Sequence, residues 1–114
     1  MKRTFAYFLI WAGIVSAAES RPTPWSKSTI AAGQDLYRNN CVVCHDIDKD
    51  RAHSRKFGPS LQHLSRIEKF PSGAKPTRPY VTVRIKFGGV LMPAFKDKLT
   101  DQEINTLIDY IESK

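Results

Sequence analysis

The sequence predicts a single all-α domain. Its 114 residues allow one compact domain and no more. Apolar residues recur at helical spacing in two segments, residues 28–39 and 100–111, on either side of a middle region rich in charge and proline. We therefore expect these two segments to form the main helices of the fold.

Segment 100–111 carries the strongest helical signal. Thr100 and Glu103 form a T-x-x-E capping box, and Asp101 adds negative charge to the first turn, where the helix dipole favours it. The apolar residues that follow obey the i, i+3, i+4, i+7 rule: Ile104, Leu107, Ile108 and Ile111. One face of this helix is therefore expected to be buried.

Segment 28–39 is expected to form the other main helix. Ser26 and Ser28 are both suitable N-caps, and the helix is predicted to run to about Asn39, just before two cysteines. One packing face is indicated by three residues at helical spacing: Ile30, Gly33 and Tyr37.

The middle of the chain is predicted to consist mostly of loops. Residues 46–56 are mostly charged and indicate a solvated loop, whereas residues 60–66 allow a short helix. Three prolines mark a further loop: Pro71, Pro76 and Pro79. In residues 80–88 apolar side chains alternate with others, a pattern that by itself favours a strand.

The N-terminal segment, residues 1–18, has the three parts of a secretory signal peptide. Positive charge at Lys2 and Arg3 is followed by an apolar run and then by small residues at 16–18. The run is shorter than the roughly 20 apolar residues that a membrane-spanning helix needs. We therefore expect export to the periplasm with cleavage near Ala18, in preference to a retained anchor.

Export limits the classes of partner to which a positively charged protein could bind. Removal of residues 1–18 would lower the formal net charge from +7 to +5 and leave 96 residues. That length is marginal for a self-sufficient core, which a bound cofactor would help to complete. The basic surface suits an acidic protein partner or a transient contact with a membrane complex, and export argues against nucleic acid.

Cys41-Val42-Val43-Cys44-His45 has the C-x-x-C-H spacing of covalent haem attachment. Two thiols three positions apart on a helical turn reach both vinyl groups of one porphyrin, and His45 is then an axial ligand of the iron. A thioredoxin-like dithiol would follow a strand rather than a helix. A zinc site needs two further ligands, for which only His53 and His63 remain. We therefore expect one covalent haem c.

Met92 is the candidate for the sixth iron ligand. It is the only methionine besides the initiator and lies between Gly88-Gly89 and Pro93. A lone methionine is more often a core filler, but this context beside a haem motif favours ligation, which raises the reduction potential. His53, in the charged loop, and His63, expected on the surface of a short helix, are the rival ligands.

The mature chain, from about residue 28 to residue 111, resembles the class I cytochromes c along nearly its whole length. Gly33 and Tyr37 stand eight and four positions before the first motif cysteine, where the family has small and aromatic residues. Residues 58–61 are similar to the family's G-P-x-L segment, and residues 92–95 to its M-P-x-F segment.

For the fold, the resemblance implies three to five short helices around one haem. Residues 28–114 would be the cytochrome c domain, after an N-terminal lead-in at residues 19–27. Residues 80–88 would be helical despite their alternation, because burial against haem overrides propensity. Leu107 and Tyr110 would cross the N-terminal helix where Gly33 permits a close approach.

For the site, the resemblance implies that the Pro59 carbonyl accepts a hydrogen bond from the second ring nitrogen of His45 and so orients it. The chain departs from mitochondrial members because no tryptophan follows Trp25 to bind a haem propionate. Three residues are candidates for that role: Arg78, Tyr80 and Arg84.

The implied function is that of a soluble one-electron carrier between respiratory or dehydrogenase partners, not of an enzyme. With His45 and Met92 both bound, the iron has no position left for substrate. The redox partner is expected to be acidic at its own docking site, because three lysines of this chain flank Met92 in sequence: Lys86, Lys96 and Lys98. Two alternatives stay open: a haem subunit bound permanently to a dehydrogenase or oxidase, and an enzyme or sensor in which a small ligand displaces Met92.

Overall fold

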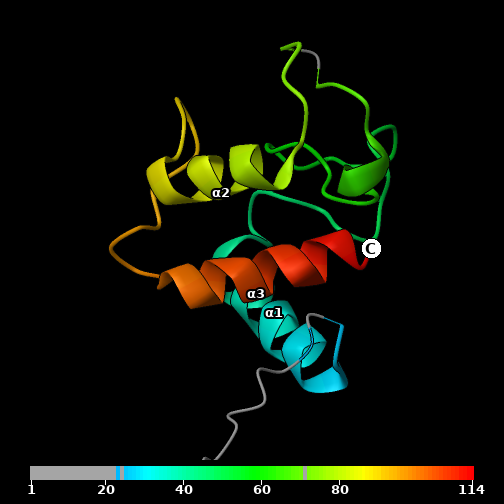
Figure 1. The fold of residues 1–114 in the computed structure, drawn as a ribbon. Coiled ribbons are helices and arrows are strands. Elements are labelled where there is room, and N and C mark those ends of the chain that lie inside the picture. Colours follow the sequence, from blue (N-terminus) through cyan, green and yellow to red (C-terminus); the bar gives the residue numbers. More distant parts are fainter. Residues whose placement is uncertain (1–22, 24, 71) are drawn as a thin grey trace, which may run out of the picture.

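The computed structural model describes residues 23, 25–70 and 72–114 (Figure 1). In that part the elements are α1 (Lys27–Asn40), the 3-10 turn η1 (Leu64–Arg66), α2 (Arg78–Phe87) and α3 (Asp101–Glu112). The all-α prediction is confirmed. The predicted signal peptide, with most of the lead-in, lies outside the described residues. None of the helices described is long and apolar enough to cross a membrane.

Helices α1 and α3 begin at the caps that the sequence indicates. The Ser26 hydroxyl accepts a hydrogen bond from the Thr29 N–H at 3.1 Å, so α1 starts at Lys27. Both halves of the capping box form at the start of α3, between Thr100 and Glu103. The four apolar residues predicted to face inward are at most 2% exposed: Ile104, Leu107, Ile108 and Ile111.

The close crossing of α1 and α3 organises the core (Figure 1). Gly33 is buried at the crossing, and a Cβ atom there would lie 2.5 Å from Tyr110 Cβ and 2.6 Å from the Thr106 carbonyl oxygen. The rings of Tyr37 and Tyr110 pack beside it with their centroids 5.8 Å apart. The predicted close approach at Gly33 is therefore confirmed.

Helix α2 confirms the helix that the resemblance implies for residues 80–88, in place of the strand that alternation alone favours. The Thr77 hydroxyl caps its N-terminus, and Pro79 lies in its first turn rather than in the loop predicted there. Ile85 is buried and Val81, four residues earlier, is half-buried against the core. Val83, the intervening apolar residue, is 56% exposed. Burial thus follows the four-residue spacing of a helix, and tertiary packing overrides the β-branched side chains.

Arg78 attaches the start of α2 to α3. Its guanidinium donates hydrogen bonds to the Asp109 and Glu112 carboxylates, each at 2.7 Å, and to the Asn105 carbonyl at 3.1 Å. Both carboxylates come from the last turns of α3. Two ion pairs and one backbone contact from a single rigid fork therefore hold these two helices together.

The short helix predicted over residues 60–66 is only the three-residue turn η1. His63 has φ of 54° and ψ of 32°, which is left-handed backbone that a right-handed helix cannot contain. The turn therefore starts after His63. Ser60 is buried in the preceding loop, where its hydroxyl donates to the Lys49 carbonyl.

The α1–α3 crossing should not tolerate a side chain at Gly33. Gly33→Val should lower the free energy of unfolding by about 1–3 kcal/mol, because the crossing must open. Tyr110→Ala should lower it by about 2–5 kcal/mol by leaving a cavity. Urea denaturation of the haem-loaded protein measures both. Ala32→Val, on the exposed side of α1, is the control, and a Gly33→Val midpoint no lower than that of the control would contradict the close crossing.

Candidate haem-binding site

All five residues predicted for the site line one cavity of about 510 Å³: Cys41, Cys44, His45, Pro59 and Met92. This volume lies within the range of about 300–1,000 Å³ that is typical of small-molecule and cofactor sites. The structure thus brings together a motif at the end of α1 and a methionine about fifty positions later in the chain.

The walls of the cavity are mostly apolar. The apolar lining includes Leu61, Leu64, Phe70, Val81, Ile85, Phe95 and Ile111. Phe57, Val90 and Leu91 also line it, and each is at least 70% exposed, so the polypeptide presents apolar surface there. Arg51 and Arg84 are the two guanidinium groups on the lining. Such a cavity suits a large, flat, apolar group with negative charge on its edge.

The C-x-x-C-H motif forms a hydrogen-bonded turn immediately after α1. The Cys41 N–H donates to the Tyr37 carbonyl at 2.8 Å. The N–H groups of Cys44 and His45 then donate to the Cys41 carbonyl at 3.1 and 2.9 Å. Both cysteines are free and half-buried. The turn therefore aligns two thiols and the imidazole along one cavity.

The Cys41 thiol does not have the character of a reactive dithiol. Burial raises its pKa to about 11, with a smaller contribution from Cys44. Thioredoxin-like cysteines act through a lowered pKa that makes the thiolate available near neutral pH. The electrostatics of this position therefore argue against a thiol–disulfide function.

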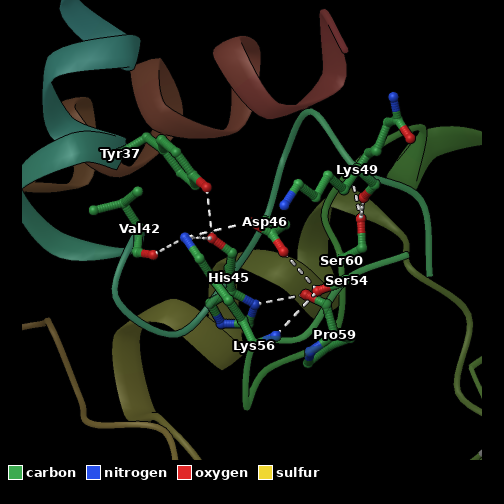
Figure 2. Close-up of polar contacts among 10 residues, drawn as sticks. Tyr37, Val42, His45, Asp46, Lys49, Ser54, Lys56, Pro59 and Ser60 are labelled. Atoms are coloured by element: carbon green, nitrogen blue, oxygen red, sulfur yellow. Dashed lines mark hydrogen bonds and ion pairs between the residues drawn. The ribbon is translucent and has the colours of Figure 1, made fainter. Parts of the chain in front are cut away.

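The imidazole of His45 is held by a single hydrogen bond from its Nδ1 atom to the Pro59 carbonyl, 2.7 Å away (Figure 2). A carbonyl oxygen only accepts, so Nδ1 must carry the proton. In the neutral imidazole the other ring nitrogen, Nε2, then keeps its lone pair. This is the tautomer that a metal-ligating histidine requires.

The segment 54–61, which we call the strap, is tied to the C-x-x-C-H turn by hydrogen bonds (Figure 2). The Gly58 N–H donates to the Cys44 carbonyl at 2.7 Å. The Ser54 hydroxyl donates to the Asp46 carboxylate at 2.9 Å, which is the main reason that the pKa of Asp46 is lowered. The end of the charged loop predicted to be solvated is therefore attached to the motif.

Tyr37 connects α1 to the carbonyl of His45. Its hydroxyl donates to that oxygen at 2.6 Å, and burial raises the pKa of Tyr37 to about 12, so the donor keeps its proton. Helical periodicity correctly identifies Tyr37 as buried, but it carries no information on what the hydroxyl meets. This contact is a part of the site that sequence reasoning missed.

The loop with Met92 folds back against α2. Gly88 ends the helix with φ of 70°, a conformation that favours glycine, and the Gly89 N–H donates to the Met92 carbonyl at 2.9 Å. The Phe95 N–H then donates to the Ile85 carbonyl at 3.0 Å. These bonds hold the half-buried Met92 at the cavity.

The two rival histidines do not line the cavity. His53 is exposed in a surface turn, where its Nδ1 atom lies 2.6 Å from the Asp50 carboxylate. His63 is exposed immediately before η1.

The three candidate propionate partners do not all lie at the cavity. Arg78 is engaged by α3 and is not among the lining residues. Tyr80 and Arg84 both line the cavity and are joined by a 3.0 Å hydrogen bond from the guanidinium to the phenol oxygen. Arg51 also lies on the lining, above the ring of Phe70. Arg51 was missed because it sits in a run of charged residues with no distinguishing pattern.

These residues fit a haem: two half-buried thiols, a histidine with Nε2 free, a thioether and an apolar cavity with two guanidinium groups. Together with the all-helical fold they define a c-type cytochrome. Residues 28–111 match the family described as cytochrome c oxidase, cbb3-type, subunit III, and the chain belongs to this family.

The chain is also similar to a cytochrome c6 from Diacronema lutheri. The two are 25% identical over 85 residues, which cover 75% of this chain and 95% of that protein. The protein is therefore an electron-transfer protein with one covalently bound c-type haem, which contains iron. It works with redox protein partners and is not an enzyme.

The strap should not tolerate a side chain at Gly58. A Cβ atom there would lie 2.5 Å from His45 Cε1 and 2.7 Å from the Cys44 carbonyl oxygen. Gly58→Ala should therefore displace the strap and lower the free energy of unfolding by about 1–3 kcal/mol, measured by urea denaturation. Gly89→Ala is the control, since its Cβ would meet chiefly the flexible end of Arg84. Equal midpoints would contradict the packing of Gly58 on His45.

Proposed function

We propose that this protein is a one-electron carrier whose haem is attached at Cys41 and Cys44 and whose iron is bound by His45 and Met92. The observation that carries the proposal is that all four side chains line one apolar cavity. When bound there, the haem supplies an iron centre that exchanges one electron. The remaining chemistry belongs to the side chains.

Each side chain has a distinct task in this proposal. The two thioethers prevent loss of the cofactor. The Pro59 carbonyl accepts a hydrogen bond from Nδ1 of His45, so that Nε2 would be the nitrogen that binds the iron. The Met92 thioether favours Fe(II) and raises the reduction potential. With His45 and Met92 both bound to the iron, no position would be left for a substrate, and the protein would carry electrons.

The haem propionates are assigned to the polar part of the cavity. Arg84 and Tyr80 are joined there, and Arg51 lies on the same lining. A guanidinium group suits a carboxylate because it donates two parallel hydrogen bonds. Arg78 is left out of this assignment because α3 already engages it.

Export completes the proposal. Residues 1–18 are the signal peptide, cleavage falls near Ala18, and the mature protein works in the periplasm as a soluble shuttle. The support is the charge and hydropathy pattern of these residues.

The docking surface is proposed to lie beside the methionine loop. Lys96 and Lys98 are exposed there, whereas Lys86 is half-buried and forms a 2.7 Å ion pair with Asp101. Exposed Val90 and Leu91 add apolar area next to these charges. A shuttle must dissociate quickly, so the interface should bury less than about 1,200 Å².

A second candidate function is favoured by the family description, which names a subunit of a cbb3-type oxidase. In this alternative the chain would be a resident haem subunit of a larger complex. Size-exclusion chromatography of native extract distinguishes the two: a carrier elutes at the mass of the small protein, and a resident subunit elutes with the complex.

Replacing Met92 should open the iron to small ligands. Met92→Ala should lose the weak near-infrared band of methionine-bound Fe(III), lower the reduction potential and bind carbon monoxide or cyanide readily. Spectroscopy and redox titration of the purified protein measure these changes. A variant with the parent's spectrum and potential would show that another residue, such as His53 or His63, is the ligand.

The parent protein should keep its colour through acid–acetone extraction, because its haem is bound covalently at Cys41 and Cys44.

Reduction by the redox partner should slow as ionic strength rises from low to physiological values, because salt screens the attraction of Lys96 and Lys98 for an acidic surface. Lys96→Glu or Lys98→Glu should slow it several-fold further at low salt with the optical spectrum unchanged. Lys27→Glu, in the first turn of α1, is the control and should leave the rate near the parent's. Rates that respond neither to salt nor to these substitutions would show that docking is apolar.

A further inference from the structure

Lys56 lies in the middle of the strap and turns its side chain toward the haem-attachment turn (Figure 2). Its ammonium group donates to the Val42 carbonyl and, at 3.1 Å, to the His45 carbonyl. The Asp46 carboxylate lies 3.4 Å away. The Lys56 side chain is only 30% exposed, which is unusual for a lysine in a charged loop.

The backbone oxygens of this turn differ in which groups donate hydrogen bonds to them. The Cys41 oxygen is satisfied within the turn, and the Cys44 oxygen accepts the Gly58 N–H. The Val42 oxygen depends on Lys56, and the His45 oxygen on Lys56 and Tyr37. Backbone oxygens with restricted access to water need a partner. Lys56 therefore connects both ends of the segment that carries Cys44 and His45.

The charge of Lys56 has a direct electrostatic consequence. Oxidised haem carries one more positive charge than reduced haem, so a fixed ammonium group beside the backbone of His45 disfavours oxidation. The partial burial of Lys56 limits the screening of this interaction by water and salt. The Asp46 carboxylate acts in the opposite direction and offsets part of the effect.

We propose that Lys56 is a positioning residue for His45, and that its ammonium group holds the reduction potential of the haem iron above the value that the same site would have without it. The inference rests on His45 being the iron ligand in the proposed function. It follows from the juxtaposition of Lys56 with two carbonyls of the turn and with Asp46.

The test measures reduction potentials of haem-loaded variants by redox titration. Lys56→Met keeps an unbranched side chain that is one heavy atom shorter and removes the charge, and it should shift the potential downward. Asp46→Asn removes the opposing charge and should shift the potential upward. A role limited to holding the fold together does not produce shifts of opposite sign.

The charge-retaining and distant variants serve as controls. Lys56→Arg should keep the potential close to the parent's. Lys27→Met removes an equal charge about 20 Å away along α1, at the rise of about 1.5 Å per residue, and should leave the potential unchanged. If Lys56→Met does not fold, Lys56→Gln replaces it: the amide N–H groups can still donate to the carbonyls, the charge is removed, and the potential should again shift downward.

Different results would contradict the proposed iron ligation and the proposed role of Lys56. A parent protein without the near-infrared band of methionine-bound haem would overturn the proposed ligation, and the role of Lys56 with it. A parent with that band, together with an unshifted or lowered potential in Asp46→Asn, would overturn the role of Lys56 alone. A Lys56→Met variant that keeps the parent's potential would also overturn the role of Lys56 alone.

Discussion

The crossing of α1 and α3 at Gly33 is the contact on which the other parts of this protein depend. Because Gly33 has no side chain, the two helices approach closely enough for Tyr37 to pack against Tyr110. That packing buries Tyr37, and the buried hydroxyl then reaches the His45 carbonyl. The position of the haem-attachment turn is thus set by a helix contact that lies outside the cavity.

The second constraint is the pairing of the attachment turn with the strap, which converts a loop of ordinary surface composition into part of the site. Backbone groups of the strap provide three of the connections, at Gly58, Pro59 and Leu61, and side chains provide the others. A backbone carbonyl is a reliable acceptor because it does not titrate, and it fixes which ring nitrogen of His45 donates. Gly58 belongs to the same arrangement because a larger residue would meet the imidazole.

Helix α2 contacts α3 and the start of the methionine loop through two arginines on different faces of the helix. Arg78 attaches its first turn to the end of α3. Arg84, about one and two-thirds turns later, lines the cavity and donates to the Tyr80 hydroxyl and the Gly88 carbonyl. The methionine loop therefore starts from a helix that is fixed on the opposite side by ion pairs. This arrangement lets a long loop hold Met92 without further secondary structure among the described residues.

The sequence by itself determined the main helices, the haem motif and the candidate ligands, because capping boxes, helical periodicity and C-x-x-C-H are local patterns. Three features lay beyond these local patterns and depend on tertiary structure. Residues 78–87 are helical because Val81 and Ile85 bury against the core, which local propensity does not register. His63 breaks the short helix expected around it through a left-handed backbone. Lys56 and Arg51 looked like members of a solvated charge run, since the partners that distinguish them are distant in sequence and meet them only in the folded chain.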